Sequence, residues 1–156
     1  MKKVLAFPQL GDYKHPIGKF LRRVTNLEVI DTPPITRKTI DLGSKYSPDS
    51  VCIPFKYNLG NFIEALDMGA NVLLQAGGGC RYRYYAEVQE TILKDLGYNF
   101  QFIQIIGGDS LNFKEVFTIF KKLNPTLTKR KFIHEGLSTP VSYTHLRAHE
   151  TKANLV

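Results

Sequence analysis

The sequence is poor in cysteine and methionine, with two of each, and it contains no tryptophan. Two cysteines, Cys52 and Cys80, exclude a disulfide-rich secreted domain, because such domains need several bridges to support a small core. No apolar run approaches the roughly 20 residues of a membrane-spanning helix, and the N-terminus lacks the apolar segment of a signal peptide. We therefore expect a cytoplasmic protein without a membrane segment, whose cysteines are free or bind metal.

Residues 140–156 (PVSYTHLRAHETKANLV) differ in character from the rest of the chain. Permitted codons for this segment spell a DNA sequence that resembles the transposon-end adapter used in library preparation. We therefore expect a read-through artefact without packing partners, attached to a truncated native domain over residues 1–139. The alternative is a native polar tail. His145 and His149 are spaced like two zinc ligands on a helix, but they are set aside with the segment.

Basic residues outnumber acidic ones, with 21 Lys and Arg against 14 Asp and Glu and a formal net charge of +7. Most are scattered, apart from small clusters such as residues 129–131. A positive field of this size would attract an anionic ligand or an acidic partner, although a solvated surface accounts for it too. We expect no nucleic-acid partner.

Short apolar runs alternate with segments of helical periodicity. The strands are predicted in residues 2–9, 27–33, 71–76 and 100–107, and the helices in residues 15–24, 54–69, 84–96 and 112–124. Segment 35–47 is ambiguous, because Thr36 and Thr39 favour a short helix ending at Gly43 while its β-branched residues do not. Alternation of this kind predicts parallel βαβ units. We expect an α/β domain of flavodoxin-like, three-layer form with a mainly parallel, four-stranded sheet.

Helix boundaries and buried faces follow from the same patterns. Asn112 is predicted to cap the last of these helices, and Gly97 to end the helix before it. On the helix of residues 84–96, the apolar residues at helical spacing are expected to face the core. These residues are Val88, Ile92 and Leu96.

The two cysteines occupy corresponding places in this predicted fold. Cys52 directly precedes a helix with Pro54 in its first turn, where the missing N–H of proline has no intrahelical partner. Cys80 follows the buried strand of residues 71–76 and a glycine-rich loop. Helix starts and the carboxyl ends of strands share one edge of a doubly wound sheet, the edge where ligands bind. The sequence therefore predicts both sulfurs at that edge.

Two ordered motifs surround the cysteines: Pro-Asp-x-x-Cys-x-Pro-Phe-Lys over residues 48–56, and GGGCRYRYYAE over residues 77–87. With them, the chain resembles the amino-terminal part of the 2-hydroxyacyl-CoA dehydratase family, in its activase-related branch. Members of this family include 2-hydroxyglutaryl-CoA dehydratase and benzoyl-CoA reductase. The resemblance covers most of residues 1–107.

The resemblance implies a [4Fe-4S] cluster held by three cysteines, with Cys52 and Cys80 as two of the three. Thiolates are the usual protein ligands of such clusters. Gly78 and Gly79 would let the backbone approach the cluster, and Arg81 would contribute charge beside it. The sequence contains no third cysteine, so we expect that this chain alone holds a cluster weakly or not at all.

Two positions depart from the family pattern. A glycine, Gly79, precedes Cys80 where proline is common, and Arg83 stands where glycine is common. Lys56, Arg81 and Arg83 would set the charge around a cluster or meet CoA phosphates. Ordinary surface charges explain these three residues equally well.

The function implied by the resemblance is the elimination of water from a 2-hydroxyacyl-CoA. In this family, an ATP-dependent activase delivers one low-potential electron, which passes through the cluster to the thioester and allows a radical elimination. The expected partners are therefore an activase and an acyl-CoA substrate. The alternative is a non-catalytic iron-sulfur electron carrier or an activase partner protein.

Other sites have weaker support in the sequence. Gly77, Gly78 and Gly79 precede a helix but lack the spacing of a nucleotide-binding loop. A Cys80 nucleophile would need a nearby base, and a zinc site would need two distant histidines. The candidate histidines are His15 and His134. The aromatic run of Tyr82, Tyr84 and Tyr85 is more typical of packing at a helix start than of a cofactor site.

Overall fold

The structure, a computed structural model, describes residues 2–76, 84–105 and 112–139. Within these ranges the sheet consists of β1 (Val4–Ala6), β2 (Glu28–Val29), β3 (Val72–Gln75) and β4 (Gln101–Gln104). The strand order is β2-β1-β3-β4, and every neighbouring pair is parallel. The predicted parallel, four-stranded α/β fold is confirmed. The packing predicted for residues 140–156 lies outside the described residues.

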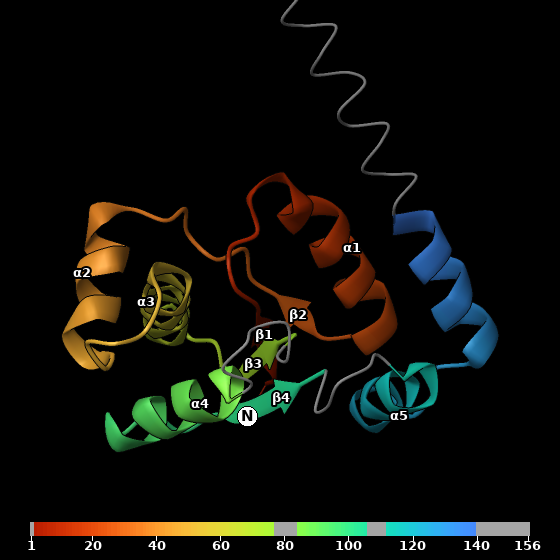
Figure 1. Cartoon of the computed structure of the whole chain (residues 1–156). Helices are drawn as coiled ribbons and strands as arrows, with labels where there is room; N and C mark the ends of the chain where they lie inside the picture. Colours follow the sequence, from red (N-terminus) through yellow and green to blue (C-terminus); the bar gives the residue numbers. More distant parts are fainter. Residues whose placement is uncertain (1, 77–83, 106–111, 140–156) are drawn as a thin grey trace, which may run out of the picture.

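Helices cover both faces of the sheet (Figure 1). One face packs on α1 (Lys14–Thr25) and α5 (Phe113–Leu123), and the other on α3 (Ile53–Asp67) and α4 (Tyr85–Asp95). Successive strand side chains point to opposite faces. Leu5, Val72 and Leu74 accordingly join the α1 and α5 core, whereas Ala6 and Leu73 join the α3 and α4 core. All four residues of β3 are buried, as a central strand covered on both sides requires.

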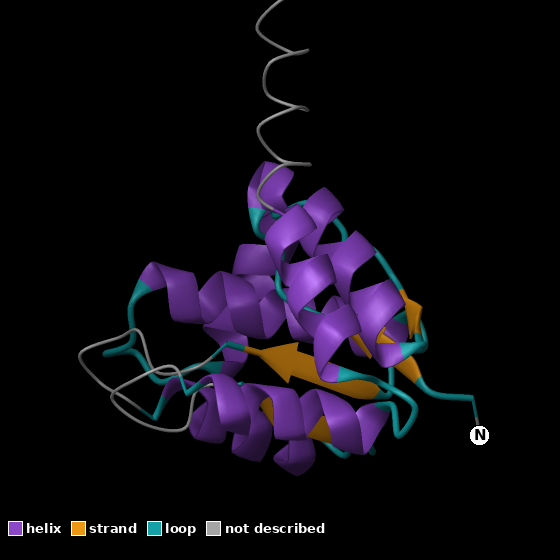
Figure 2. Ribbon diagram, turned by 90° about the vertical axis from the view of Figure 1, so that its right-hand side faces the viewer, coloured by secondary structure: helices purple, strands orange, loops and turns teal. Residues whose placement is uncertain are grey.

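The strands run side by side and point toward one edge of the domain (Figure 2). β2 and β4 are the edge strands. β2 is shorter than predicted, and Pro33 and Pro34 follow it without an N–H to donate to a ladder. A single-turn 3-10 helix, Gly11–Tyr13, leads into α1. Among the described residues, no helix has both the length and the apolar character needed to cross a membrane.

The ambiguous segment forms a helix, α2 (Arg37–Tyr46), which packs on the outer side of α3. Thr36 and Thr39 form a reciprocal capping box at its start, as their spacing favours. The predicted end at Gly43 is wrong, because α2 continues to Tyr46. Gly43 instead faces α3, where an added Cβ would overlap the backbone carbonyl of Lys56. The glycine allows a close helix crossing and does not end the helix.

The predicted C-terminal end of α4 and the predicted N-cap of α5 are confirmed. The predicted buried face of α4 is partly wrong. Gly97 has a positive φ of 87° after α4, and the Asn112 side chain accepts a hydrogen bond from Lys114 N at 3.0 Å at the start of α5. On α4, Ala86, Gln89 and Leu93 are the buried residues. Val88 and Ile92 are half-buried and Leu96 is 36% exposed. The fully buried face instead includes a polar residue, Gln89, which a count of apolar residues does not select.

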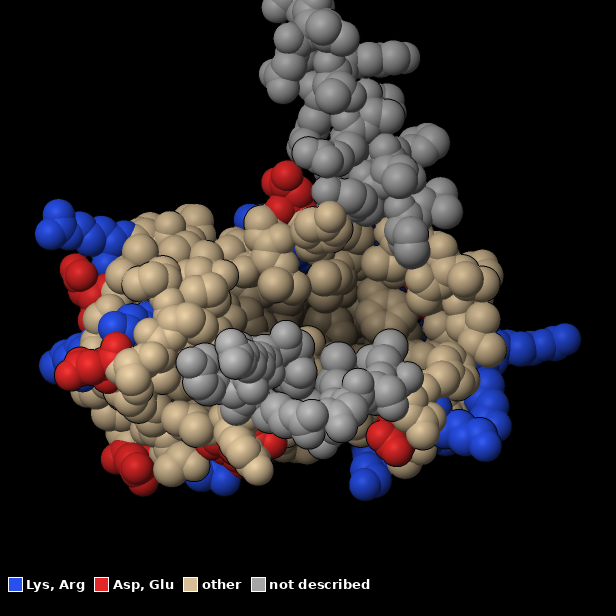
Figure 3. All heavy atoms as spheres, in the orientation of Figure 1, with Lys and Arg blue, Asp and Glu red and all other residues tan. Residues whose placement is uncertain are grey.

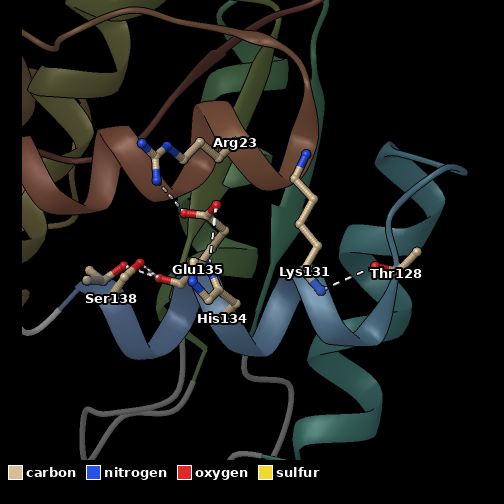
Figure 4. Close-up of polar contacts among 7 residues, drawn as sticks. Arg23, Thr128, Lys131, His134, Glu135 and Ser138 are labelled. Carbon is tan, nitrogen blue, oxygen red and sulfur yellow. Dashed lines mark hydrogen bonds and ion pairs between the residues drawn. The ribbon is translucent and has the colours of Figure 1, made fainter.

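A further helix occupies residues 129–139 and packs beside α1 and α5 (Figures 1 and 4). Phe132 joins the core from this helix. The Arg23 guanidinium of α1 donates a hydrogen bond to Glu135 Oε2 at 2.8 Å. This hydrogen bond, opposed by desolvation and helped by the positive charge of Arg23, lowers the pKa of the Glu135 carboxyl below its usual value.

Glu135→Gln should therefore destabilise the domain by up to about 1 kcal/mol at pH 7, the usual range for a surface ion pair. A carboxyl with a lowered pKa in the folded state contributes stability above its unfolded pKa and loses it as the pH falls through the folded pKa. The difference in the free energy of unfolding between the parent protein and Glu135→Gln should disappear at pH values below the folded pKa of Glu135. Urea unfolding at several pH values measures it, and a double-mutant cycle with Arg23→Gln assigns it to the pair. A pH-independent difference would contradict the prediction.

Candidate functional site

Cys52 stands at the N-cap position of α3, directly before the first helical turn. Its backbone carbonyl accepts hydrogen bonds from Phe55 N at 3.1 Å and Lys56 N at 3.3 Å, and its side chain makes no capping bond. The thiol is free and exposed. Cys52 therefore stands at the start of a helix, where the sequence predicts it.

A cavity of about 210 Å³ lies between the first turn of α3 and the start of α4. Its walls come from the two helices and from the residues just before each of them. These residues are Ser50, Val51, Cys52, Phe55, Tyr84, Tyr85 and Val88. α4 is the helix that directly follows residues 77–83, the segment that holds Cys80. The structure thus brings Cys52 against the helix that follows the Cys80 segment.

Most of the predicted cluster environment lies outside the described residues. This holds for Cys80 and for the accompanying residues Gly78, Gly79 and Arg81. The prediction that both sulfurs share one edge of the sheet therefore stays a prediction. Cys52, together with Ala76 and Tyr84 on either side of the segment, is described.

Tyr85, from the aromatic run, lines the same cavity as Cys52. Its ring packs edge-on against Phe55, with 4.9 Å between ring centroids, which agrees with packing at a helix start. Burial raises the pKa of the Tyr85 phenol above its usual range, and the negative charge that Cys52 can carry raises it further. Sequence reasoning did not predict that Tyr85 and Cys52 line the same cavity. The available signal was the position of Tyr85 at a helix start.

A buried network of glutamine side chains holds the surrounding elements together. Gln75 Nε2, at the end of β3, donates to Gln89 Oε1 at 2.9 Å, and Gln89 Nε2 donates to the carbonyl of Phe55 at 3.3 Å. Gln75 Oε1 accepts from Ala76 N at 3.0 Å. Gln89 is fully buried. The network therefore fixes the first turn of α3 to the end of β3 and to α4, and no sequence motif marked it.

Other predicted candidates lie away from this cavity. The cavity walls include neither Lys56 nor His15 nor His134, and the His134 side chain is 78% exposed beside Glu135 (Figure 4). Within residues 2–76, 84–105 and 112–139, no three His, Cys, Asp or Glu side chains form a group suited to a metal ion. The described residues thus contain one cysteine, Cys52.

Apolar side chains are exposed at the edge that carries this cavity. Figure 3 views the domain from the carboxyl ends of the strands, and the Lys, Arg, Asp and Glu side chains of the described residues lie mostly at the rim of this view. Several exposed large apolar residues lie where strands end or helices begin at this edge. These residues are Leu10, Tyr13, Ile35, Ile53, Tyr84 and Phe113. The described part of this edge therefore exposes apolar surface.

In comparisons of this chain with protein-family models, curated proteins and solved structures, none of the three finds a match.

Proposed function

We propose that this chain is the N-terminal α/β domain of an iron-sulfur protein of the 2-hydroxyacyl-CoA dehydratase type. Cys52 and Cys80 are then two of three thiolate ligands of a [4Fe-4S] cluster. The observation that carries the proposal is the position of Cys52, a free thiol at the N-terminus of α3 beside the helix that follows the Cys80 segment. A reducing cytoplasm suits such free thiols.

The chemistry of Cys52 fits a cluster ligand. Cys52 lies at the N-terminal end of α3, the positive end of the helix dipole, and Phe55, Tyr85 and Val88 give its cavity a partly apolar lining. Gly78, Gly79 and Arg81 would supply close backbone approach and positive charge from residues 77–83. When bound, the cluster supplies a single low-potential electron.

The partners of this proposal are an ATP-dependent activase and a 2-hydroxyacyl-CoA. The activase would provide the electron, and the protein would direct it to the thioester so that hydroxide leaves. One observation favours the alternative of a non-catalytic electron carrier. The cavity beside Cys52, about 210 Å³, is smaller than the roughly 300–1,000 Å³ of typical small-molecule pockets.

Iron content tests the cluster. The protein with its native continuation beyond residue 139, purified without oxygen, should contain about four irons and absorb as a [4Fe-4S] protein. Cys52→Ser and Cys80→Ser should each lose most of the iron while circular dichroism stays unchanged, because apolar burial holds the core together. The chain of residues 1–156, with two thiolates, should bind little iron.

Ser50→Ala is the matched control, since Ser50 lines the same cavity without supplying a thiolate; it should keep its iron. Full iron content in a Cys52→Ser, Cys80→Ser double variant would end the cluster proposal. Turnover of 2-hydroxyacyl-CoA thioesters with an activase and ATP separates the two functions. A loaded protein that accepts the electron but transforms no thioester is the carrier.

A further inference from the structure

Phe55 is the residue through which α4 holds the turn that begins at Cys52. Its backbone N–H donates to the Cys52 carbonyl at 3.1 Å. Its own carbonyl accepts a hydrogen bond from Gln89 Nε2 on α4 at 3.3 Å, and its ring packs edge-on against Tyr85, also on α4. Phe55 is buried, so these contacts fix the backbone of the Cys52 turn from the interior of the domain.

Gln89 is in turn held by the sheet. Gln75, at the end of β3, donates from Nε2 to Gln89 Oε1 at 2.9 Å, and Gln75 Oε1 accepts from Ala76 N at 3.0 Å. A continuous series of hydrogen bonds therefore leads from the carboxyl end of the central strand β3, through Gln89 and Phe55, to the carbonyl of Cys52. Ligand sites of parallel α/β sheets lie at this end of the strands.

Folding alone does not require an amide at position 89. Gln89 shares the buried face of α4 with Ala86 and Leu93, and burying its amide carries a desolvation cost that its hydrogen bonds offset. Replacing both partners of such a bond by apolar groups of the same shape can be nearly neutral for stability. What the paired amide adds is a single preferred arrangement of the groups that it joins, and one of these groups is the Phe55 carbonyl.

We propose that Gln89 is a positioning residue for Cys52, which acts through the Phe55 carbonyl to keep the first turn of α3 where the Cys52 sulfur can bind iron. This role rests on the proposed function, in which Cys52 is a thiolate ligand, and it identifies what holds the ligand turn in place. Residues beyond the direct ligands orient those ligands, and their loss typically lowers metal affinity by about 10–100-fold.

Gln89→Met tests this role, because methionine keeps the length of the side chain and removes both hydrogen bonds. The protein with its native continuation beyond residue 139 is loaded with iron, and iron release to excess chelator is followed at a temperature where the protein stays folded. Gln89→Met should release iron about tenfold faster than the parent. Gln75→Met should accelerate the release less, since Gln89 then keeps its bond to Phe55. This second variant covers the case in which Gln89→Met does not fold.

Asn61→Ala is the matched control that separates positioning from stability. Asn61 is a fully buried amide of α3 itself, and its two hydrogen bonds lead to Gln9 N and the Pro33 carbonyl. Asn61→Ala should therefore lower the urea midpoint and yet release iron at a rate close to that of the parent. If iron release simply followed the loss of stability in both variants, Gln89 would have a structural role only, and the inference would be overturned.

Hydrogen exchange in the metal-free chain of residues 1–156 gives a measurement that needs no iron. The Lys56 amide donates to the Cys52 carbonyl at 3.3 Å, so its exchange rate reports opening of the Cys52 turn. Exchange at Lys56 should be about tenfold faster in Gln89→Met than in the parent, the change expected when one buried hydrogen bond is lost. The Phe62 amide, in the middle of α3, should change less.

The two measurements distinguish failure of this role from failure of the cluster. Faster exchange at Lys56 in a protein that binds no iron would support the hold of Gln89 on the Cys52 turn and refute the cluster. Bound iron, with equal exchange and equal release rates in the parent, Gln89→Met and Gln75→Met, would retain the cluster and refute the role of Gln89.

Discussion

Gly60→Ala should lower the stability of the domain by about 3 kcal/mol or more, a loss beyond the usual small-to-large substitution. Gly60 on α3 faces Thr39 and Gly43 on α2, and an added Cβ would overlap the backbone carbonyl of Thr39. Backbone atoms of a buried helix pair cannot swing aside as a side chain can. The two helices would have to separate, and the gain of about 1 kcal/mol in helix propensity would not offset this cost.

Gly43→Ala should have a similar effect, because its Cβ would overlap the Lys56 carbonyl from the other side of the same crossing. Gly18→Ala is the matched control in α1. The nearest atom to its added Cβ is the Arg22 guanidinium at 3.3 Å, the mobile end of a side chain. This variant should be neutral or slightly stabilised.

Thermal unfolding measures these differences. At about 2–4 °C per kcal/mol for a domain of this size, the Gly60→Ala midpoint should fall by about 10 °C relative to Gly18→Ala. Equal midpoints for the two variants would show that α2 and α3 do not approach as closely as the structure has them. The crossing also holds α3, the helix that Cys52 precedes, against α2.

The strands could be predicted from the sequence, whereas the role of Gly43 could not. Strand positions follow from local apolar runs, and caps such as Thr36 and Asn112 follow from local hydrogen-bonding chemistry. Gly43 lies on a helix, where a glycine reads as an end signal. Its actual partner, Gly60, lies on another helix, and no local pattern pairs the two. Close backbone approach is a tertiary property.

The α4 helix and the candidate site show the same limit. Periodicity counts apolar residues, so it selected Val88, Ile92 and Leu96 and overlooked Gln89, which is fully buried because its amide is paired on both sides. The motif around Cys52 predicted the helix start correctly. Tyr85 and Cys52 line the same cavity, but the local patterns place each of them only at a helix start and do not pair the two.

Asn61→Ala should lower stability by about 2–4 kcal/mol, because it leaves the buried Gln9 N and the partly buried Pro33 carbonyl without partners, at about 1–3 kcal/mol for a buried group and less for a partly buried one. Asn61 is fully buried in the middle of α3. Its Oδ1 accepts from Gln9 N at 2.8 Å and its Nδ2 donates to the Pro33 carbonyl at 3.0 Å. These two groups lie in the segments after β1 and β2, so one side chain fixes both segments to the helix that carries Cys52.

Asn71→Ala is a close control for this prediction. Asn71 makes the same pair of bonds, accepting from Val4 N at 2.8 Å and donating to the Lys2 carbonyl at 2.8 Å. These bonds lie in a partly exposed place near the start of β1, where water can replace the lost amide. The expected loss is about 1 kcal/mol. Urea unfolding should therefore give a clearly lower midpoint for Asn61→Ala than for Asn71→Ala, with similar m-values. Equal losses would mean that water reaches Gln9 N and the Pro33 carbonyl, and that these segments are held to α3 by something other than Asn61.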